Sequence, residues 1–470
     1  MPSRTGFPDH FLWGVATSAY QIEGSPLADG ASPSIWHRFS HTPGATHGGD
    51  TGDVACDHYR RYREDVALMR DLGIPAYRFS LSWGRLLRDG RGPANPPGLD
   101  FYSRLIDLLL AAGIRPMVTL CHWDLPAALD DLGGWRHRDS IDWFADYAEL
   151  AFRAYGDRVD LWATFNEPWM MSDAGYLKGL HAPGHRDPGE AVRAAHHLLC
   201  AHGAAVERFR AGPGGAIGLV VNLEPKHPAT DAAADAAAAA RAGAYMNRHY
   251  LDPLFLGHYP EELPAMFGDA WPRWEIEDFA RIRQPIDFLG VNYYSRGIVR
   301  DDPASPPARA RSILPEHAPR TAMGWEIHPD GLREILEWVK ARYGDLPLYV
   351  TENGAAFDDP PAGLGGPIED APRVEYLRDH LSATRTALAN GVDVRGYFAW
   401  SLLDNFEWQY GYAKRFGLVH VDFTTQRRTP KRSALFYRDV IRSHGGAIGP
   451  NPAAGTVSGS GPHSRGACAP

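Results

Sequence analysis

Two glutamates stand where apolar runs of the sequence end. Residues 159–165 have the composition of a buried strand and are followed by Asn166 and Glu167 in the motif TFNEP. Residues 347–351 are likewise followed by Glu352 in the motif TENG. A strand that ends on strongly polar groups indicates that its end opens into a cleft, because such groups are costly to bury without partners. Two carboxyl groups that flank one glycosidic bond are what glycoside hydrolysis requires.

Other polar and aromatic side chains follow or lie within further apolar runs. They are Gln21, Arg78, His122, Trp123, Asn222, Asn292, Tyr294, Trp400, Glu407 and Trp408. Amides, carboxylates and an imidazole supply donors and acceptors for hydroxyl groups. The C–H faces of a pyranose ring pack well on aromatic rings. Together these residue types favour a pocket for a sugar.

Eight apolar runs alternate with helical patterns along the chain. The runs are residues 12–20, 76–83, 115–123, 159–165, 217–222, 287–293, 347–351 and 394–402, and the helical patterns include residues 59–72, 101–112 and 140–155. Near-continuous apolar strands that alternate with helices predict a parallel sheet covered on its outer face. Eight such units predict an α/β fold, a single (β/α)8 TIM barrel with long βα loops. Chemistry in this fold lies at the C-terminal strand ends, so we expect the polar residues to converge at one mouth.

The chain divides into one large domain and a short tail. We assign residues 1–444 to the barrel catalytic domain and residues 445–470, rich in Gly, Ser, Pro and Ala, to a disordered tail. Residues 301–320 are rich in proline and predict a long loop after the sixth strand. Residues 232–240 are mostly alanine, the best helix former, and predict an exposed helix.

The composition excludes several classes of partner. The net charge is −9 and the sequence has no blocks of lysine and arginine, which disfavours nucleic acid and membrane surfaces as partners. No run approaches the roughly 20 apolar residues of a membrane span. Few, widely spaced cysteines (Cys56, Cys121, Cys200 and Cys468) favour a reducing compartment. The N-terminus lacks an apolar leader, so we expect a cytoplasmic protein, and the oligomeric state stays open.

Six motifs, in order and at barrel-strand spacing, make the sequence resemble glycoside hydrolase family 1, the β-glucosidase-like retaining enzymes. The motifs are FLWGVATSAYQIEG, YRFSLSWGR, TFNEP, NYYS, YVTENGAAF and SLLDNFEW, and the resemblance extends from about residue 7 to residue 443. It implies hydrolysis of terminal, non-reducing β-D-glucosyl residues, with β-galactosides and β-fucosides as related substrates. The expected substrate is a small β-glucoside or cello-oligosaccharide, as in cellulose degradation, and neither a cofactor nor a metal is expected.

The resemblance also assigns roles to the two glutamates. Glu167 matches the general acid/base and Glu352 matches the nucleophile. Arg78 and Tyr294 match the positions that keep the nucleophile ionised, by charge and by hydrogen bond. A negative nucleophile nearby would in turn favour the protonated form of Glu167.

Further positions of the family motifs bind the substrate. By resemblance, the substrate-binding residues are Gln21, His122, Trp123, Asn166, Glu407 and Trp408, with Trp400 as the aromatic platform, Asn292 beside the acid/base, and Trp325 on the aglycone side. Cys121, the Met170-Met171 pair and Asp173 depart from the common pattern of the family and leave the aglycone preference open.

Three other functions remain to be weighed. A 6-phospho-β-glycosidase would carry serine in place of Glu407 and would use a downstream lysine and tyrosine, whereas this sequence has Lys414 and Phe416. An inactive sugar-binding barrel would normally have lost one of the two glutamates. A metal-dependent barrel hydrolase would need three or four ligands. A candidate metal cluster for it is His196, His197, Cys200 and His202, which no acidic motif accompanies.

Overall fold

The computed structural model describes residues 6–212, 214–360 and 366–449. Within these residues, eight parallel strands close into a barrel in the order β1-β11-β10-β7-β5-β4-β3-β2. The strands are β1 (Leu12–Ala16), β2 (Ala76–Ser80), β3 (Arg115–Cys121), β4 (Leu161–Asn166), β5 (Ala216–Asn222), β7 (Phe288–Asn292), β10 (Leu348–Asn353) and β11 (Val394–Trp400). Each strand falls on one of the eight predicted apolar runs, so the predicted (β/α)8 barrel is confirmed.

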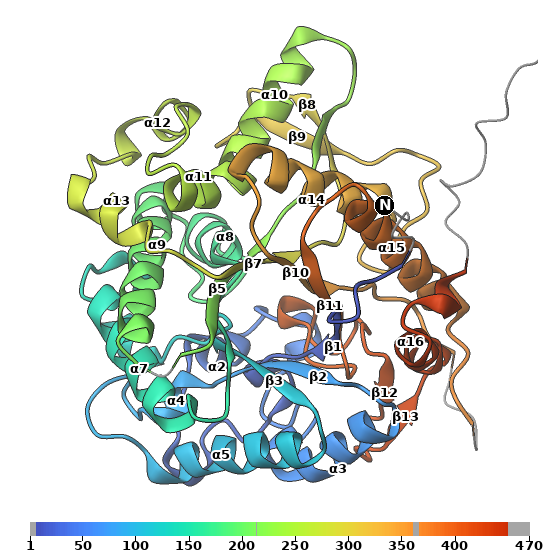
Figure 1. The fold of residues 1–470 in the computed structure, drawn as a ribbon. Helices are drawn as coiled ribbons and strands as arrows, with labels where there is room; N and C mark the ends of the chain where they lie inside the picture. The colour runs from blue at the N-terminus through green and yellow to red at the C-terminus, as the bar shows by residue number, and fades with distance from the viewer. Residues whose placement is uncertain (1–5, 213, 361–365, 450–470) are drawn as a thin grey trace, which may run out of the picture.

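Helices cover the outside of the barrel (Figure 1). The longer ones are α3 (His58–Asp71), α5 (Pro96–Ala111), α7 (Ser140–Tyr155), α9 (Pro188–Arg210), α14 (Asp330–Tyr343), α15 (Ala371–Ala389) and α16 (Arg432–Arg442). The sequence of α5 shows why such a segment is helical and where it docks. Proline occupies its first turn, where no helical hydrogen bond is lost. Phe101, Leu105 and Leu109 are buried at four-residue spacing, which gives the helix one apolar face.

Further helices occupy the connections between the strands and the helices named above. They are α1 (Ala19–Ile22), α2 (Ile35–Ser40), α4 (Trp83–Leu86), α6 (Ala127–Asp131), α8 (Pro168–Met170), α10 (Ala233–Gly243), α11 (His249–Phe255), α12 (Glu262–Phe267) and α13 (Ile276–Ile282). A two-stranded sheet of β12 (Val419–Val421) and β13 (Arg428–Pro430) lies between β11 and α16 in the chain. The βα connections are therefore long, as the sequence predicts, and they contain helices and a small sheet of their own.

A small three-stranded sheet corrects one prediction. It contains β6 (Lys226–Pro228), β8 (Gly297–Asp301) and β9 (Ala310–Ile313). The prediction of a continuous loop over residues 301–320 is wrong at β9, because residues 310–313 pair antiparallel with β8 and the prolines of the segment lie outside the paired residues. The predicted alanine-rich helix is α10, which buries Ala238 and Ala242 with Val299 of β8 and is therefore only partly exposed.

The barrel interior has an apolar layer beneath a polar one. Its lower layer is filled by side chains from strands all round the barrel, among them Ala76, Met117, Leu161, Val220, Phe288, Tyr349 and Phe398. Side chains of a strand point to the same side at every second residue. Arg78 on β2, Thr119 on β3 and Asn292 on β7 therefore follow these apolar residues toward the C-terminal strand ends. The alternation of side chains along the strands therefore places polar groups at the C-terminal opening of the barrel, above the apolar layer.

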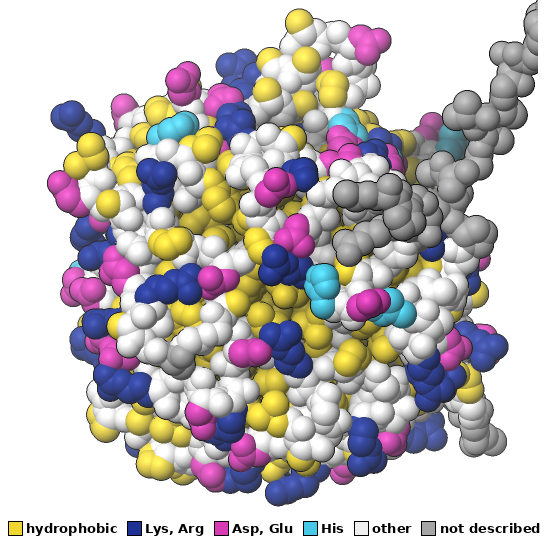
Figure 2. Space-filling model, in the orientation of Figure 1, with side chains coloured by type: hydrophobic (Ala, Val, Ile, Leu, Met, Phe, Trp, Pro, Cys, Tyr) yellow, Lys and Arg dark blue, Asp and Glu magenta, His cyan; other side chains and the backbone are white. Residues whose placement is uncertain are grey.

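The outer surface carries charges of both signs. Figure 2 shows Lys and Arg side chains interspersed with Asp and Glu over the face that it draws. No helix among the described residues is both long enough and apolar enough to cross a membrane.

Of the predicted tail, residues 445–449 are described and include a short 3-10 helix, Gly446–Ile448, with Ile448 buried. Residues 450–470 lie outside the described residues.

We predict that Gly354→Ala destabilises the protein. A Cβ atom at Gly354, just after β10, would lie 1.7 Å from the backbone oxygen of Trp400, so one of the two chain segments must move. Such overpacking costs about 1–3 kcal/mol or more. Urea denaturation should show a lower free energy of unfolding. The matched control is Gly6→Ala, where a Cβ atom would meet nothing within 4 Å; equal stability of the two variants would contradict the prediction.

Candidate active site

A cavity of about 540 Å³ opens at the C-terminal ends of the barrel strands. Its walls contain the predicted residues His122, Trp123, Asn166, Glu167, Asn292, Tyr294, Trp325, Glu352, Trp400, Glu407 and Trp408. The two remaining predicted residues are buried behind the walls, and each is bonded to a carboxylate in the cavity: Arg78 to Glu352 and Gln21 to Glu407. Residues from all parts of the sequence therefore meet in one place.

The Arg78 guanidinium joins four barrel strands beneath this cavity. Its side chain is 1% exposed. Nη1 donates to Glu352 Oε1 on β10 at 2.7 Å and Nη2 donates to Asn166 Oδ1 on β4 at 2.6 Å. Nε donates to Thr119 Oγ1 on β3 at 3.1 Å. A planar guanidinium can hold several acceptors in fixed directions at once, so Arg78 sets the positions of both Glu352 and Asn166.

Arg78 also determines which nitrogen of His122 carries hydrogen. Because Arg78 can only donate, the Asn166 atom that faces it must be the oxygen. Asn166 Nδ2 then faces His122 Nε2 at 3.0 Å and donates to it, which leaves the hydrogen on Nδ1. Burial, and secondarily the Arg78 charge, hold the pKa of His122 well below its usual value, so the ring is neutral. His122 Nδ1 is buried and has no protein partner among the described residues.

Glu167 is held by Asn292 where β4 turns into α8. Its backbone φ is 48°, a left-handed conformation in the turn after the strand. Asn292 Nδ2 donates to Glu167 Oε1 at 2.7 Å, and Asn292 Oδ1 accepts from Thr351 Oγ1 at 2.7 Å, which fixes the amide orientation. A proton on Glu167 must therefore reside on Oε2. Burial, and then the charge of Glu352, raise the pKa of Glu167 to about 8.

Glu352 is buried in the same cavity but has different partners. Burial raises its pKa, while the Arg78 charge and the hydrogen bonds from Arg78 and Tyr294 oppose that rise. Tyr294 donates its hydroxyl to Glu352 Oε2 at 2.7 Å, so both carboxylate oxygens are held. Of the two glutamates, Glu352 is therefore the one that loses its proton first, since Glu167 lacks a direct cationic partner.

A third carboxyl, Glu407, lies near Gln21. Burial, and then the charge of Glu352, raise the pKa of Glu407 to about 8. Gln21 Nε2 donates to the Phe406 backbone oxygen at 3.0 Å and lies 3.5 Å from Glu407 Oε2. Ser18 Oγ donates to Gln21 Oε1 at 2.6 Å, which fixes the orientation of the amide. Glu407 lines the cavity, whereas Gln21 lies behind it and holds Glu407 in position.

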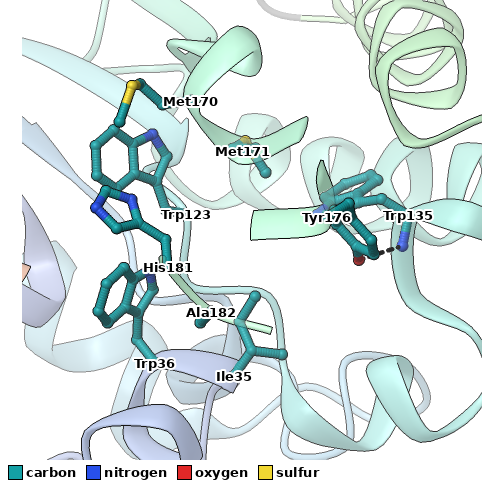
Figure 3. Close-up of a pocket in the computed structure, with 9 residues that line it drawn as sticks. All are labelled: Ile35, Trp36, Trp123, Trp135, Met170, Met171, Tyr176, His181 and Ala182. Atoms are coloured by element: carbon teal, nitrogen blue, oxygen red, sulfur yellow. Dashed lines mark hydrogen bonds between the residues drawn. The ribbon is translucent and has the colours of Figure 1, made fainter. Parts of the chain in front are cut away.

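Aromatic rings form one wall of the cavity. The His122 ring lies nearly parallel to the rings of Trp400 and Trp408, with centroids 5.7 and 6.0 Å away. Trp123 packs on Trp408 with ring centroids 4.5 Å apart. Behind this wall is a smaller pocket, in which Figure 3 shows the rings of Trp123, His181 and Trp36 lying one over another. This packing holds Trp123 and Trp408 in place.

Sequence reasoning missed two groups of residues. Ser18, Thr119 and Thr351 orient the predicted side chains from behind, and only their positions on or beside predicted strands hinted at this. The outer cavity wall contains further residues from loops and short helices of the βα connections and from the β8–β9 hairpin. These include Met246, Arg296, Ser312, Ile313, Leu314, Met323, Gln409 and Tyr410. No motif marks them, because their loops reach the cavity only through the fold.

The side chains of the histidine-rich stretch in α9 do not converge on one point. His197 Nδ1 contacts the Trp135 backbone oxygen at 2.8 Å, and His202 Nδ1 contacts Thr164 Oγ1 at 2.7 Å. His196 Nε2 faces Asp278 Oδ2 at 3.0 Å, with Cys200 Sγ 3.5 Å from that nitrogen. Both oxygens of Asp278 already accept from Arg138, at 2.6 and 2.8 Å. A salt-bridge network accounts for His196 and Asp278 without a metal.

The lysine and tyrosine that a 6-phospho-β-glycosidase would use are not found in the cavity wall at the downstream positions 414 and 416. Lys414 Nζ donates to the backbone oxygen of Ala322 at 2.6 Å, and Lys414 does not line the cavity. Phe416 and Glu407 both line it. A carboxylate at this position would repel a phosphate. A 6-phospho-β-glycosidase is therefore not favoured.

Comparison with known proteins agrees with this geometry. The model of glycosyl hydrolase family 1 matches residues 3–446. The 1,4-β-D-glucan glucohydrolase of Thermotoga neapolitana is 49% identical over 441 residues, which cover 93% of this chain and 99% of the relative. Beta-glucosidase A of Thermotoga maritima is 49% identical over 445 residues, with coverages of 93% and 98%. The structure of the Thermotoga maritima β-glucosidase in complex with glucoimidazole superposes with a TM-score of 0.91 at 49% identity, over 94% of this chain and 100% of that one. The chain belongs to glycosyl hydrolase family 1.

Proposed function

We propose that this protein is a retaining β-glucosidase with Glu352 as nucleophile and Glu167 as general acid/base. One observation carries the proposal. Two buried carboxyls share one cavity, and Arg78 and Tyr294 stabilise the charged form of Glu352, whereas Glu167 has a pKa raised to about 8. When the environments of two carboxyls separate their pKa values, the one with the lower pKa is ionised and can act as the nucleophile. The one with the higher pKa keeps its proton and can act as the acid in the same reaction.

In the first step, the Glu352 carboxylate attacks the anomeric carbon of the sugar. The bond from that carbon to the aglycone oxygen breaks, and Glu167 transfers its proton from Oε2 to the leaving oxygen. The products of this step are the free aglycone and a covalent glycosyl ester on Glu352.

In the second step, Glu167 acts as a base. The ester on Glu352 carries no negative charge, so the charge that raised the pKa of Glu167 is gone and its ionised form becomes more favourable. The Glu167 carboxylate takes a proton from water, whose oxygen bonds to the anomeric carbon as the ester bond breaks. Arg78 and Tyr294 receive the returning charge on Glu352. Two displacements at one carbon retain the β configuration.

The remaining polar groups of the cavity recognise the sugar ring. Gln21 and Glu407 bind outer hydroxyls, His122 donates its Nδ1–H, and Asn166 uses the second hydrogen of its amide toward the 2-hydroxyl. Trp400 supports the ring face. Because one amide–carboxylate pair can serve epimeric hydroxyls, β-galactosides and β-fucosides are accepted beside β-glucosides.

Small β-glucosides and cello-oligosaccharides are the proposed substrates. The name of the Thermotoga neapolitana relative, a 1,4-β-D-glucan glucohydrolase, supports the second class. Trp325 and the β8–β9 hairpin line the outer cavity, where the leaving group would lie. The free, buried thiols of Cys56, Cys121 and Cys200 support the cytoplasm as the compartment. An inactive sugar-binding barrel is not favoured, since both carboxyls are present and face one cavity.

We predict that Glu352→Gly abolishes hydrolysis of an aryl β-glucoside with a good leaving group and that azide restores turnover. Azide would occupy the space of the missing carboxylate and attack from the same side, so NMR should identify the α-glucosyl azide. Glu167→Ala provides the matched control, because azide should there intercept the glycosyl ester and give the β-azide. The opposite stereochemistry in the two variants would reverse the assigned roles.

We predict that kcat/KM of the wild type falls as pH rises through about 8, because the acid form of Glu167 is required and its pKa lies there. In Glu167→Ala this alkaline limb should disappear. The variant should also lose more activity on poor leaving groups than on good ones, since acid assistance matters most for poor ones. Initial rates on a series of aryl β-glucosides over a range of pH test both effects, and equal losses across the series would contradict an acid role.

We predict that Arg78→Lys moves the acidic limb of the kcat/KM profile to higher pH. Lysine cannot hold Glu352 and Asn166 together, so the pKa of Glu352 should rise and its ionised form should appear at higher pH. Loss of a charged hydrogen bond should also reduce kcat/KM by about tenfold to a hundredfold. Arg104→Lys, at an exposed salt bridge with Asp100, is the matched control. An unshifted acidic limb in Arg78→Lys would contradict the role of Arg78.

A further inference from the structure

A second cluster of metal-ligating side chains lies outside the catalytic cavity. It consists of His37 in α2, His41 just after α2, and Asp53 in the segment that leads to α3. One ring nitrogen of each histidine and a carboxylate oxygen of Asp53 lie within 4.8 Å of one another. We propose that this cluster binds a divalent transition-metal ion of the zinc type. The proposal is independent of the glycosidase chemistry, in which none of the three residues takes part.

The hydrogen bonding of His41 leaves a lone pair facing a carboxylate. His41 Nδ1 lies 2.7 Å from the backbone oxygen of His37, which can only accept, so Nδ1 carries the hydrogen. In the neutral ring, Nε2 then has a lone pair. This atom lies 3.1 Å from Asp53 Oδ2. Two lone pairs at that distance repel unless a cation lies between them, and a metal ion or a proton would satisfy both.

His37 completes a three-ligand arrangement. The two histidines are one helical turn apart and their rings stack with centroids 4.4 Å apart. His37 Nε2 lies 3.7 Å from Asp53 Oδ1, on the other carboxylate oxygen. In a tetrahedral zinc site with bonds of about 2.0–2.2 Å, neighbouring ligand atoms are about 3.3–3.6 Å apart. The observed separations need only small side-chain rotations to reach that range.

The backbone that carries Asp53 is fixed before any metal binds. The Asp53 backbone oxygen accepts from the backbone N–H of Ser25 at 2.7 Å, and the backbone N–H of Cys56 donates to Ile22 at 3.1 Å. These bonds tie the segment to the end of α1 and to the turn that follows α1. Binding at a site whose ligands are already positioned loses less conformational entropy than binding that must order a loop.

The cluster also has room for a fourth ligand. A surface pocket of about 320 Å³ has His37 and Asp53 in its walls, together with residues 25–28 and Arg60. Water or a small anion could complete the coordination there. Arg60 carries a positive charge at the pocket and therefore repels a metal cation. Its Nη1 donates to Asp57 Oδ1 at 3.1 Å, and the negative charge of this carboxylate offsets part of the repulsion.

The donor set selects the class of metal. Two imidazole nitrogens and one carboxylate suit zinc, cobalt, nickel or copper, whereas calcium and magnesium prefer sites built from oxygen alone.

The loop that carries Asp53 also supports the catalytic end of the barrel. Asp50 Oδ2 accepts from the backbone N–H of Tyr412, and the Thr51 backbone oxygen accepts from the Tyr412 hydroxyl at 2.7 Å. Through these two bonds to Tyr412, a bound ion stabilises the position of the segment that follows Glu407 and Trp408.

Zinc titration of the whole protein tests the proposal. The chain carries Cys468→Ser, so that no thiol of the tail competes, and is treated with EDTA and dialysed at neutral pH. Calorimetry should show one zinc ion bound per chain and no binding of calcium. His41→Gln and Asp53→Asn should each weaken zinc binding by more than about tenfold. His258→Gln, at an exposed histidine outside the cluster, is the matched control and should bind zinc as the parent does.

Two results would overturn the proposal. One is the absence of zinc binding by the parent at millimolar zinc, which would mean that a proton alone joins His41 to Asp53. The other is unchanged zinc affinity in both His41→Gln and Asp53→Asn. Circular dichroism confirms that the variants fold, and turnover of an aryl β-glucoside without zinc should equal that of the parent. Loss of glycosidase activity in the parent would count against the proposed function and would leave the metal site standing.

Discussion

The buried guanidinium of Arg78 is the interaction on which the rest of the site depends. It neutralises Glu352, orients Asn166 and, through that amide, leaves the hydrogen of His122 on Nδ1. A buried charge is tolerated only when its partners are in place, because an unpaired ion in the interior costs several kcal/mol. The strands β2, β3, β4 and β10 must therefore keep their relative positions for the site to exist, and the closed barrel ensures that they do.

Burial shifts the pKa of three glutamates of the cavity in the same direction, and their partners produce the difference between them. Desolvation raises the pKa of Glu167, Glu352 and Glu407 alike. Only Glu352 receives a guanidinium and a phenol, whereas Glu167 receives a single amide N–H. One low-dielectric cavity can thus hold an ionised carboxylate next to a protonated carboxylic acid, which acid/base chemistry near neutral pH requires.

Strand geometry links the stability of the barrel to its chemistry. The same two-residue period that places Ala76 and Met117 in the apolar floor places Arg78 and Thr119 in the polar layer above it. The floor excludes water from beneath the guanidinium, which strengthens its interactions with Glu352 and Asn166. The aromatic wall around Trp408 does the same from the side, because the rings of Trp36, Trp123 and His181 pack behind it.

The sequence by itself determined the eight barrel strands, the order of the catalytic motifs and the two glutamates, because apolar periodicity and short motifs are local properties of the chain. It did not predict β9, whose strand conformation depends on pairing with β8 rather than on its own proline-rich surroundings. Nor did it indicate the hydrogen position on His122 or the cluster of His37, His41 and Asp53. The hydrogen position on His122 arises from contacts between distant residues, such as the bond between Arg78 and Glu352 across 274 positions, and only the closed barrel brings such residues together. The cluster depends instead on how the connection after β1 folds back on itself, since its three residues lie between positions 37 and 53.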